Sequence, residues 1–267
     1  MNIALFTSNH LRHKYIANQL AQNLPLKLIL CEQKSDKIQD ASAYQKPDQQ
    51  LLEMHFAERD RSEKSFFGEN QHFPQRVEAV ILPFGALNSE NTLALLEEHQ
   101  ITHILLFGTS IIKPFILNRF PEKVINLHLG LSPYYKGSGT NFFPIVNQEF
   151  ECIGATFHLA TEKVDAGAIL HQIRPDEVSP EDTIHSLGNK VILKAGKVYP
   201  KVVELYQSQQ IRLHYQNPIE HSHEYRIKDF TPSVLRQAHE VIAQGGVKKY
   251  LEKQSEKNND KPIISGF

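Results

Sequence analysis

The chain of 267 residues carries a formal net charge of −1 at pH 7, and 40% of its residues are apolar. This length can bury a full hydrophobic core in one large or two modest domains, and the near-neutral charge argues against nucleic acid or an anionic membrane as the main partner. The start is too short and too polar for a signal peptide, and no run approaches the roughly 20 apolar residues of a membrane helix. We expect a cytoplasmic protein in which Cys31 and Cys152 are buried thiols.

Short apolar runs alternate with helical patterns up to about residue 207. Nearly continuous apolar runs are typical of parallel strands with both faces buried. Their alternation with helices predicts a Rossmann-like α/β fold, a mostly parallel sheet with helices on both faces. Strands are expected at 2–6, 26–30, 77–82, 102–108, 123–128, 153–160 and 167–175, with helices at 13–24, 49–66, 89–99 and about 181–207.

Two segments lie outside this alternation. Residues 36–75 are long for a link between strands, and the helix expected within them would form a lid or a dimer surface. We divide the chain into a catalytic domain, residues 1–207, and a short C-terminal extension, residues 208–267. In the extension, one helix is expected near 232–252, and the last dozen residues are expected to be loose.

In an open parallel sheet, ligands bind beyond the carboxyl ends of the strands. The stretches that follow three predicted strands, 7–13, 107–112 and 126–137, are therefore the candidates for a site. Several chemistries lack their motifs: the sequence has no GxGxxG or GxxxxGK[ST] loop, no GxSxG turn, and no HExxH or paired CxxC. We expect no metal.

Two stretches carry an ordered set of polar and small residues. The first, NLHLGLSPYYKG (126–137), follows an apolar run, and the second is GATFHLATEKVDAGAIL (154–170). Asn126 and His128 are two residues apart, so in a strand both side chains face the same side. The full set, in chain order, is Asn126, His128, Pro133, Gly137, Gly154, Asp165 and Gly167.

This ordered set resembles the signature of the formyltransferase family that uses 10-formyltetrahydrofolate, which includes the methionyl-tRNA formyltransferases. The resemblance is close over roughly residues 75–205. Asn126 and Asp165 are 39 residues apart, one more than that tRNA-directed branch implies, and its usual RYRG is YYKG at 134–137. No barrel-type domain that grips tRNA is evident. These departures resemble the branch that formylates amino sugars, usually as sugar nucleotides.

The resemblance implies a catalytic set of Asn126, His128 and Asp165 that converges in an open cleft. An amine attacks the formyl carbon, which creates an oxyanion and a proton to be removed. The Asn126 amide can stabilise the oxyanion, and His128 can share that task or take the proton. Asp165 would orient His128. By contrast, His158 is expected to be a strand histidine with a satisfied partner.

The resemblance also places the folate pterin against backbone and apolar side chains, although Thr109 or Ser110 alone could simply cap a helix. A helix N-terminus with an arginine favours an anion, so the loop after the first strand is expected to bind a phosphate or carboxylate of the acceptor, unless it is a solvated basic turn. The expected folate contacts are Phe107, Gly108, Thr109, Ile111, Ile112 and Val164. The expected acceptor contacts are Asn9, Arg12, His13, Tyr134, Tyr135 and Lys136.

The sequence therefore predicts a cytoplasmic N-formyltransferase with 10-formyltetrahydrofolate as donor. The acceptor is a small-molecule amino sugar, with a nucleotide-linked one of bacterial surface glycan biosynthesis favoured, and a homodimer is an option. One alternative is a formyltetrahydrofolate hydrolase, in which water replaces the amine. Another is a methionyl-tRNA formyltransferase-like enzyme, disfavoured by the neutral charge. A non-catalytic folate or nucleotide binder would not need Asn126, His128 and Asp165 together.

Overall fold

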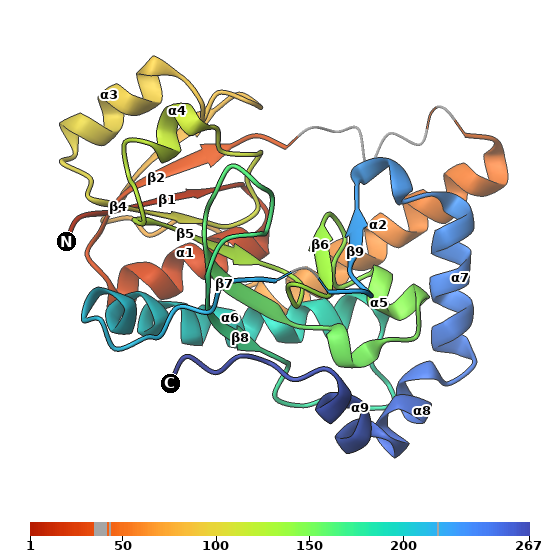
Figure 1. Ribbon diagram of the computed structural model, residues 1–267. Helices are drawn as coiled ribbons and strands as arrows, with labels where there is room; N and C mark the ends of the chain where they lie inside the picture. The colour runs from red at the N-terminus through yellow and green to blue at the C-terminus, as the bar shows by residue number, and fades with distance from the viewer. Residues whose placement is uncertain (35–41, 43, 218) are drawn as a thin grey trace.

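Seven strands form one sheet in the computed structural model, which describes residues 1–34, 42, 44–217 and 219–267 (Figure 1). The order across the sheet is β3-β2-β1-β4-β5-β7-β8. Neighbours from β3 to β5 are parallel, whereas β7 is antiparallel to both β5 and β8. The strands are β1 (Ile3–Thr7), β2 (Leu26–Glu32), β3 (Glu78–Leu82), β4 (His103–Leu106), β5 (Val124–His128), β7 (Ala155–Leu159) and β8 (Ile169–Ile173).

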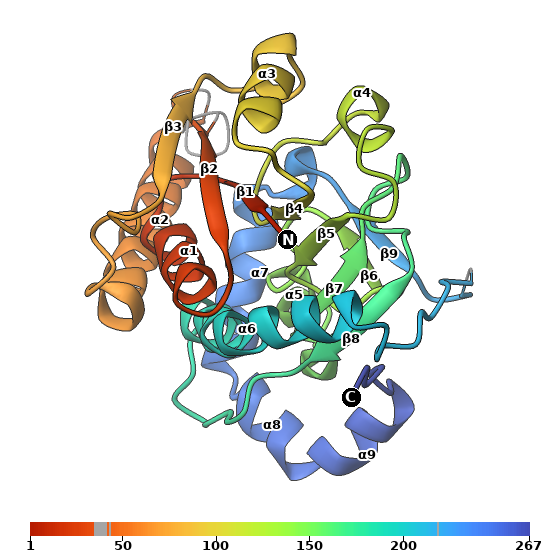
Figure 2. The same ribbon diagram turned by 90° about the vertical axis from the view of Figure 1, so that its left-hand side faces the viewer.

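Helices cover both faces of this sheet, as Figure 2 shows. On one face, α1 (Leu11–Asn23) and α6 (Ile184–Gln207) enclose a core with the sheet; on the other face, α3 (Glu90–Glu98) and α4 (Pro114–Leu117) enclose a second core. Every residue of β1 and β4 is buried, as expected for inner parallel strands. The predicted mostly parallel α/β sheet with helices on both faces is confirmed.

The segment around residues 36–75 contains α2 (Lys46–Phe67), which is longer than the predicted helix. This helix packs against α1, α6 and α7 (Pro232–Ala243). Residues 35–41 and 43 of the same segment lie outside the described residues. The proposed roles of this segment as a lid or a dimer surface stay predictions.

The C-terminal residues pack onto the rest of the chain along much of their length. β9 (His223–Tyr225) pairs in parallel with β6 (Tyr135–Gly137), so residues beyond 207 form a second small sheet with residues before it. The division at residue 207 stays a prediction. The remaining short elements are α5 (Phe143–Val146), η2 (Phe150–Cys152), η3 (Ile227–Asp229), α8 (Gly246–Glu252) and α9 (Gln254–Asp260).

Two expectations for the C-terminal region are wrong. The single helix predicted at 232–252 is two helices, α7 and α8, because Gly245 adopts a left-handed conformation (φ 75°) between them. The last dozen residues are not loose. The carbonyl of Ile264 accepts a hydrogen bond of 2.8 Å from the backbone of Gln172, and the Phe267 ring stacks on His171 with 4.3 Å between centroids.

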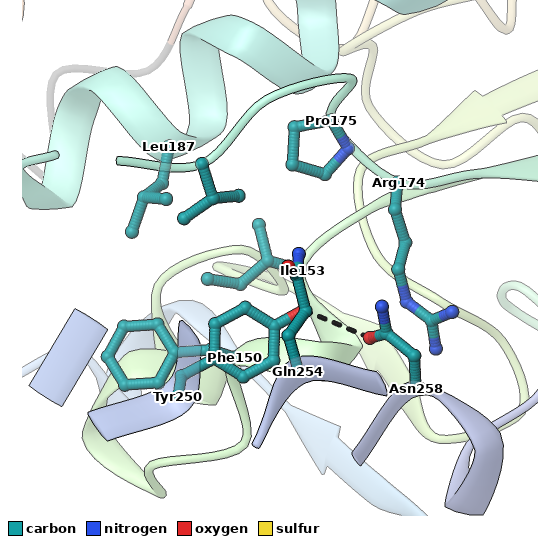
Figure 3. Close-up of a pocket in the computed structure, with 9 residues that line it drawn as sticks. Phe150, Ile153, Arg174, Pro175, Leu187, Tyr250, Gln254 and Asn258 are labelled. Carbon is teal, nitrogen blue, oxygen red and sulfur yellow. Dashed lines mark hydrogen bonds between the residues drawn. The ribbon is translucent and has the colours of Figure 1, made fainter. Parts of the chain in front are cut away.

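A small cavity of about 50 Å³ lies where the C-terminal helices meet η2 and the residues after β8 (Figure 3). Its lining includes Phe150, Arg174 and Tyr250, and the Tyr250 hydroxyl donates a 2.9 Å hydrogen bond to Asn258. The space suits a water or two rather than a substrate. No helix in the described part of the chain is long and apolar enough to cross a bilayer.

Candidate functional site

The strand register places the predicted site along one edge of the sheet. Phe6 of β1 lies beside Leu106 of β4, which lies beside Asn126 of β5. The loops that follow these parallel strands therefore share one edge, as expected for ligand sites in open sheets. The antiparallel pairing of β5 with β7 continues the row by placing His158 opposite Asn126.

Asn126 and His128 point to the same face of the sheet because they alternate along β5. Ile125 and Leu127 pack in the core under α1 and α6, whereas Val124 packs in the opposite core under α3 and α4. The two polar side chains share the face of Val124, at the carboxyl end of the strand. The expected same-sided arrangement is observed.

Asp165 completes the set from the connection between β7 and β8. Its carboxylate lies 3.3 Å from His128 Nδ1, and it accepts a 3.4 Å hydrogen bond from the Asn126 amide and a 2.9 Å bond from the Gly137 backbone. The structure therefore brings Asn126, His128 and Asp165 together. Of the three, Asn126 is the most open to a substrate, because it is half-buried whereas His128 is 6% exposed and Asp165 8%.

His158 is a fourth member of this cluster. From the sequence it was expected to be only a strand histidine with a satisfied partner. Its Nε2 lies 3.1 Å from the Asn126 amide nitrogen and 3.4 Å from the Asp165 carboxylate. Its Nδ1 lies 2.8 Å from the Leu159 carbonyl and donates there, while Nε2 faces both the Asn126 amide and the Asp165 carboxylate. The missing signal was the register between β5 and β7, which the sequence leaves open.

The cluster holds a buried carboxylate beside imidazole rings. Burial alone would raise the pKa of Asp165, but the His128 and His158 rings and the Gly137 N–H outweigh it and hold that pKa well below its usual value. Burial lowers the pKa of His128, against the opposing effect of Asp165. We therefore assign Asp165 as ionised and His128 as neutral near pH 7. Both nitrogens of the His128 ring face acceptors, Nδ1 the Asp165 carboxylate and Nε2 the Tyr135 backbone carbonyl at 3.1 Å, so the single ring proton has two competing positions.

The predicted folate-binding residues divide into two groups. The side chains of Phe107 (2% exposed) and Ile112 (6%) are buried in the two cores, so only their backbone is available to a ligand. Ile111 and Val164, by contrast, are 65% and 44% exposed. Gly108 has φ 69°, and a Cβ there would run into the His13 ring. Thr109, which follows Gly108, is half-buried.

The segment after β1, which includes the first turn of α1, differs from its predicted role in two respects. Asn9 is exposed and Arg12 is paired with Glu63 of α2. His13 is 1% exposed and packs against Phe107 with its ring tilted and 5.0 Å between ring centroids. Because burial lowers its pKa well below the usual value, His13 is neutral and offers no charge to an anion.

Two of the three predicted acceptor contacts after Pro133 point elsewhere. Tyr135 is fully buried, and its hydroxyl bonds to Glu149 and Asn147. The Tyr134 hydroxyl donates to the Pro262 carbonyl at 3.3 Å. The two tyrosines, expected to contact the acceptor, instead anchor the segment after Pro133. Lys136 is half-buried and stays a candidate.

No group of three or more His, Cys, Asp or Glu side chains among the described residues is arranged to hold a metal ion. The cluster can instead combine an amide donor, a neutral imidazole and an ionised carboxylate around one reacting centre. Together these groups can move a proton and stabilise an oxyanion.

Residues 1–203 match the family model described as Formyl transferase. The chain belongs to the formyl transferase family. The phosphoribosylglycinamide formyltransferase of Haemophilus influenzae is 31% identical over 119 residues, which are 44% of this chain and 55% of that protein. The trifunctional purine biosynthetic protein adenosine-3 of Chironomus tentans is 32% identical over 120 residues, 43% of this chain and 8% of that protein. The matches thus span about half or less of these curated relatives.

Solved structures of formyl transferases share the fold at low sequence identity. The phosphoribosylglycinamide formyltransferase of Anaplasma phagocytophilum superposes with a TM-score of 0.56 at 18% identity, covering 84% of this chain and 98% of that one. A sugar N-formyltransferase from a Shewanella species gives a TM-score of 0.53 at 18% identity, covering 86% of this chain and 78% of that one. Both support the α/β assignment of the fold.

Proposed function

We propose that this formyl transferase moves a formyl group from 10-formyltetrahydrofolate to the primary amine of a small-molecule amino sugar, with a nucleotide-linked sugar favoured. The observation that carries the proposal is the convergence of Asn126, His128 and Asp165 in a chain of this family. A protein that only binds folate has no need for a neutral imidazole held by a buried carboxylate.

The chemistry follows from the protonation states assigned above. With its proton held on Nδ1 by Asp165, His128 can accept a proton from the attacking amine at Nε2 once Nε2 leaves the Tyr135 carbonyl, which lies 3.1 Å away. The amine nitrogen bonds to the formyl carbon, the bond from that carbon to the folate nitrogen breaks, and the proton passes to the departing folate nitrogen.

Asn126 supports this reaction as the oxyanion donor. Its contact with Asp165 is long, at 3.4 Å, so one amide N–H can turn to the developing oxyanion while the 3.1 Å contact with His158 holds the group in place. Removing one such donor commonly costs about 10²–10³ in rate. His158 is thus a positioning residue for Asn126.

The donor is assigned to two exposed apolar side chains in loops at this end of the sheet. Ile111 follows β4 and Val164 precedes Asp165, and both side chains are exposed. Within the described part of the chain, the backbone N–H groups of Ile111 and Ile112 donate to no protein atom. A flat pterin can use both features, apolar contact and backbone hydrogen bonds.

The acceptor is assigned to the start of α1 and to Lys136. A phosphate there would compete with Glu63 for the Arg12 guanidinium, and Lys136 supplies a second positive charge. An open groove of about 560 Å³, lined in part by Phe143, Tyr225 and Lys228, adds room of the size small ligands occupy. Tyr225, which lines the groove, pairs with Gly137 in the small sheet. The Gly137 N–H donates to Asp165, so this strand pair links the groove to the cluster.

Phosphoribosylglycinamide is the second candidate acceptor, because the relatives aligned by sequence include enzymes named for it. The deciding experiment is an assay of tetrahydrofolate formation from 10-formyltetrahydrofolate with three acceptors in turn: nucleotide-linked amino sugars, free amino sugars and phosphoribosylglycinamide. Turnover restricted to phosphoribosylglycinamide would replace the sugar proposal. Turnover with water alone would indicate a hydrolase, and no turnover with any acceptor would contradict the proposal.

The acceptor side is tested at Arg12. Arg12→Ala is expected to raise the Michaelis constant of the acceptor more than it lowers turnover, because a guanidinium–phosphate contact exists in both the ground and the transition state. Glu63→Gln is the control: it breaks the same ion pair but leaves the guanidinium available, so the acceptor constant should not rise. An effect of Arg12→Ala on the folate constant alone would reverse the assignment of the two substrates.

A further inference from the structure

Glu32 is a buried carboxylate that the mechanism above does not use. It is the last residue of β2 and is 3% exposed. It accepts three hydrogen bonds: from the Gly85 backbone at 2.7 Å, from the Ser110 backbone at 2.8 Å and from the Ser110 hydroxyl at 2.9 Å. A buried carboxylate is costly unless its oxygens are bonded in this way, so its placement calls for a reason.

The three donors come from loops on either side of β2 in the sheet. Gly85 follows β3, and Ser110 follows β4, two strands away in the other direction. Asn88 reinforces the link, because its side chain donates to the Ile111 carbonyl at 2.9 Å and accepts from the Lys113 backbone at 2.7 Å. Glu32 is therefore the buried centre of a network that ties the loop after β4 to its neighbours.

The same loop is held at its start by two further side chains. The Thr7 hydroxyl donates to the Phe107 carbonyl at 3.0 Å, and the Lys34 ammonium donates to the Gly108 carbonyl. The backbone from Phe107 to Lys113 is thus fixed by contacts outside the loop, while Ile111 itself projects outward, 65% exposed. A loop held this way presents its free backbone groups in one geometry.

We propose that Glu32 is a positioning residue for the formyl donor: its carboxylate sets the shape of the 107–112 loop and thereby the affinity for the folate. This inference rests on the proposed function of that loop. The carboxylate is required because one oxygen accepts from Gly85 and the Ser110 hydroxyl, and the other from the Ser110 N–H. A glutamine would turn a donor toward one of these N–H groups and leave it unsatisfied.

Glu32→Gln is expected to raise the Michaelis constant of 10-formyltetrahydrofolate about tenfold or more, as loss of a hydrogen bond to a buried charged group implies. Turnover at saturating donor and the acceptor constant should stay near their wild-type values. The dissociation constant of tetrahydrofolate, measured by calorimetry without acceptor, should rise by a similar factor. Ser110→Ala, which removes only the hydroxyl, should produce a smaller shift in the same direction and serves as the second variant if Glu32→Gln fails to fold.

Asp182 offers a matched control. It is also a buried carboxylate, 5% exposed, with hydrogen bonds from the Ser179 backbone at 2.8 Å, the Ser186 hydroxyl at 2.7 Å and the Lys190 ammonium at 2.7 Å, but it bonds to no residue of the site. Asp182→Asn should lower the melting temperature without changing the folate constant.

The outcomes separate the inference from the function beneath it. If the wild-type protein neither transfers a formyl group nor binds tetrahydrofolate, the proposed function fails. If the wild-type protein is active but Glu32→Gln and Ser110→Ala change both substrates equally, or change only the melting temperature as Asp182→Asn does, the role of Glu32 is overturned.

Discussion

At the scale of single residues, Asp165 combines an unusual backbone with a demanding position. It has φ 49°, in the left-handed region that most side chains avoid, and its carboxylate meets the rings of His128 and His158. Aspartate and asparagine tolerate this conformation better than other residues with side chains. The turn can therefore carry a carboxylate, where glycine would be the ordinary choice.

Asp165→Asn is therefore the informative substitution at this position. The backbone should be retained, but a neutral amide cannot hold the His128 proton on Nδ1 as a carboxylate does. We expect formyl transfer to fall by about 10²–10⁴, with tetrahydrofolate binding largely kept. Single-turnover kinetics and calorimetry measure the two quantities, and equal losses in both would assign Asp165 to binding or folding instead.

Gly108 is a second residue where backbone and site meet. Gly108→Ala combines a left-handed φ of 69° with a methyl group that would strike the His13 ring. We expect a loss of unfolding free energy above the roughly 1–2 kcal/mol of the conformation alone, together with weaker folate binding. Gly85→Ala is the control, since Gly85 has φ 84° but nothing within 4 Å of the added methyl. Denaturant titration should give a smaller loss for Gly85→Ala; equal losses would exclude the clash.

At the scale of elements, two glycines in helical sequence patterns behave in opposite ways. Gly188 lies inside α6, with open space where a Cβ would stand. Gly245 separates α7 from α8 in a left-handed conformation, also with open space around it. An added methyl group would therefore meet no neighbour at either glycine, and the two positions differ only in backbone conformation.

Gly188→Ala is expected to stabilise the protein by roughly 0.5–1 kcal/mol, because alanine restricts the unfolded chain and suits a helix. Gly245→Ala is expected to destabilise it by roughly 1–2 kcal/mol, because alanine resists a positive φ. Chemical denaturation of the two variants beside wild type checks both signs. A stabilising Gly245→Ala would mean that α7 and α8 can join into the single helix suggested by the sequence.

At the scale of the whole molecule, buried histidines make the fold sensitive to acid. Burial lowers the pKa of His55 to about 3 and the pKa values of His171 and His185 to about 4; it also lowers those of His13 and His128. In the unfolded chain these groups titrate near the ordinary value of about 6.5. Their neutral forms therefore contribute stability that is fully present above pH 6.5 and is lost as the pH falls toward 4.

The melting temperature should accordingly fall steeply between pH 6.5 and 4.5. His55→Leu should flatten part of that slope, since His55 is 6% exposed, stands beside His185 and Phe230, and has a ring nitrogen without a hydrogen-bond partner. His221→Leu, at an exposed position, should leave the slope unchanged. Identical slopes for wild type and His55→Leu would show that other groups control the acid response.

Only part of the fold and of the candidate site could be predicted from the sequence. The inner parallel strands were predictable because burial on both faces makes them apolar runs, and Asn126, His128 and Asp165 because their spacing is a motif. The position of His158 depends on strand register, and the Arg12–Glu63 ion pair joins residues 51 apart in the chain. Tyr135 was expected to contact the acceptor, because the residues that hold its hydroxyl, Asn147 and Glu149, are contributed by a later segment that the motif does not include.

The ordered C-terminal residues also determine how the sheet meets its surroundings. An unpaired edge strand is a template for the backbone of another chain. Along β8, later residues of the same chain already pair with the edge. Ile169 exchanges hydrogen bonds of 2.8 and 3.0 Å with His214, and the Gln172 N–H donates to the Ile264 carbonyl. On the opposite edge, no residue in the described ranges forms a backbone hydrogen bond with the outer side of β3. Among the described residues, β3 is therefore the edge left open to strand addition, and loss of the last residues would free the Gln172 end of β8 as well.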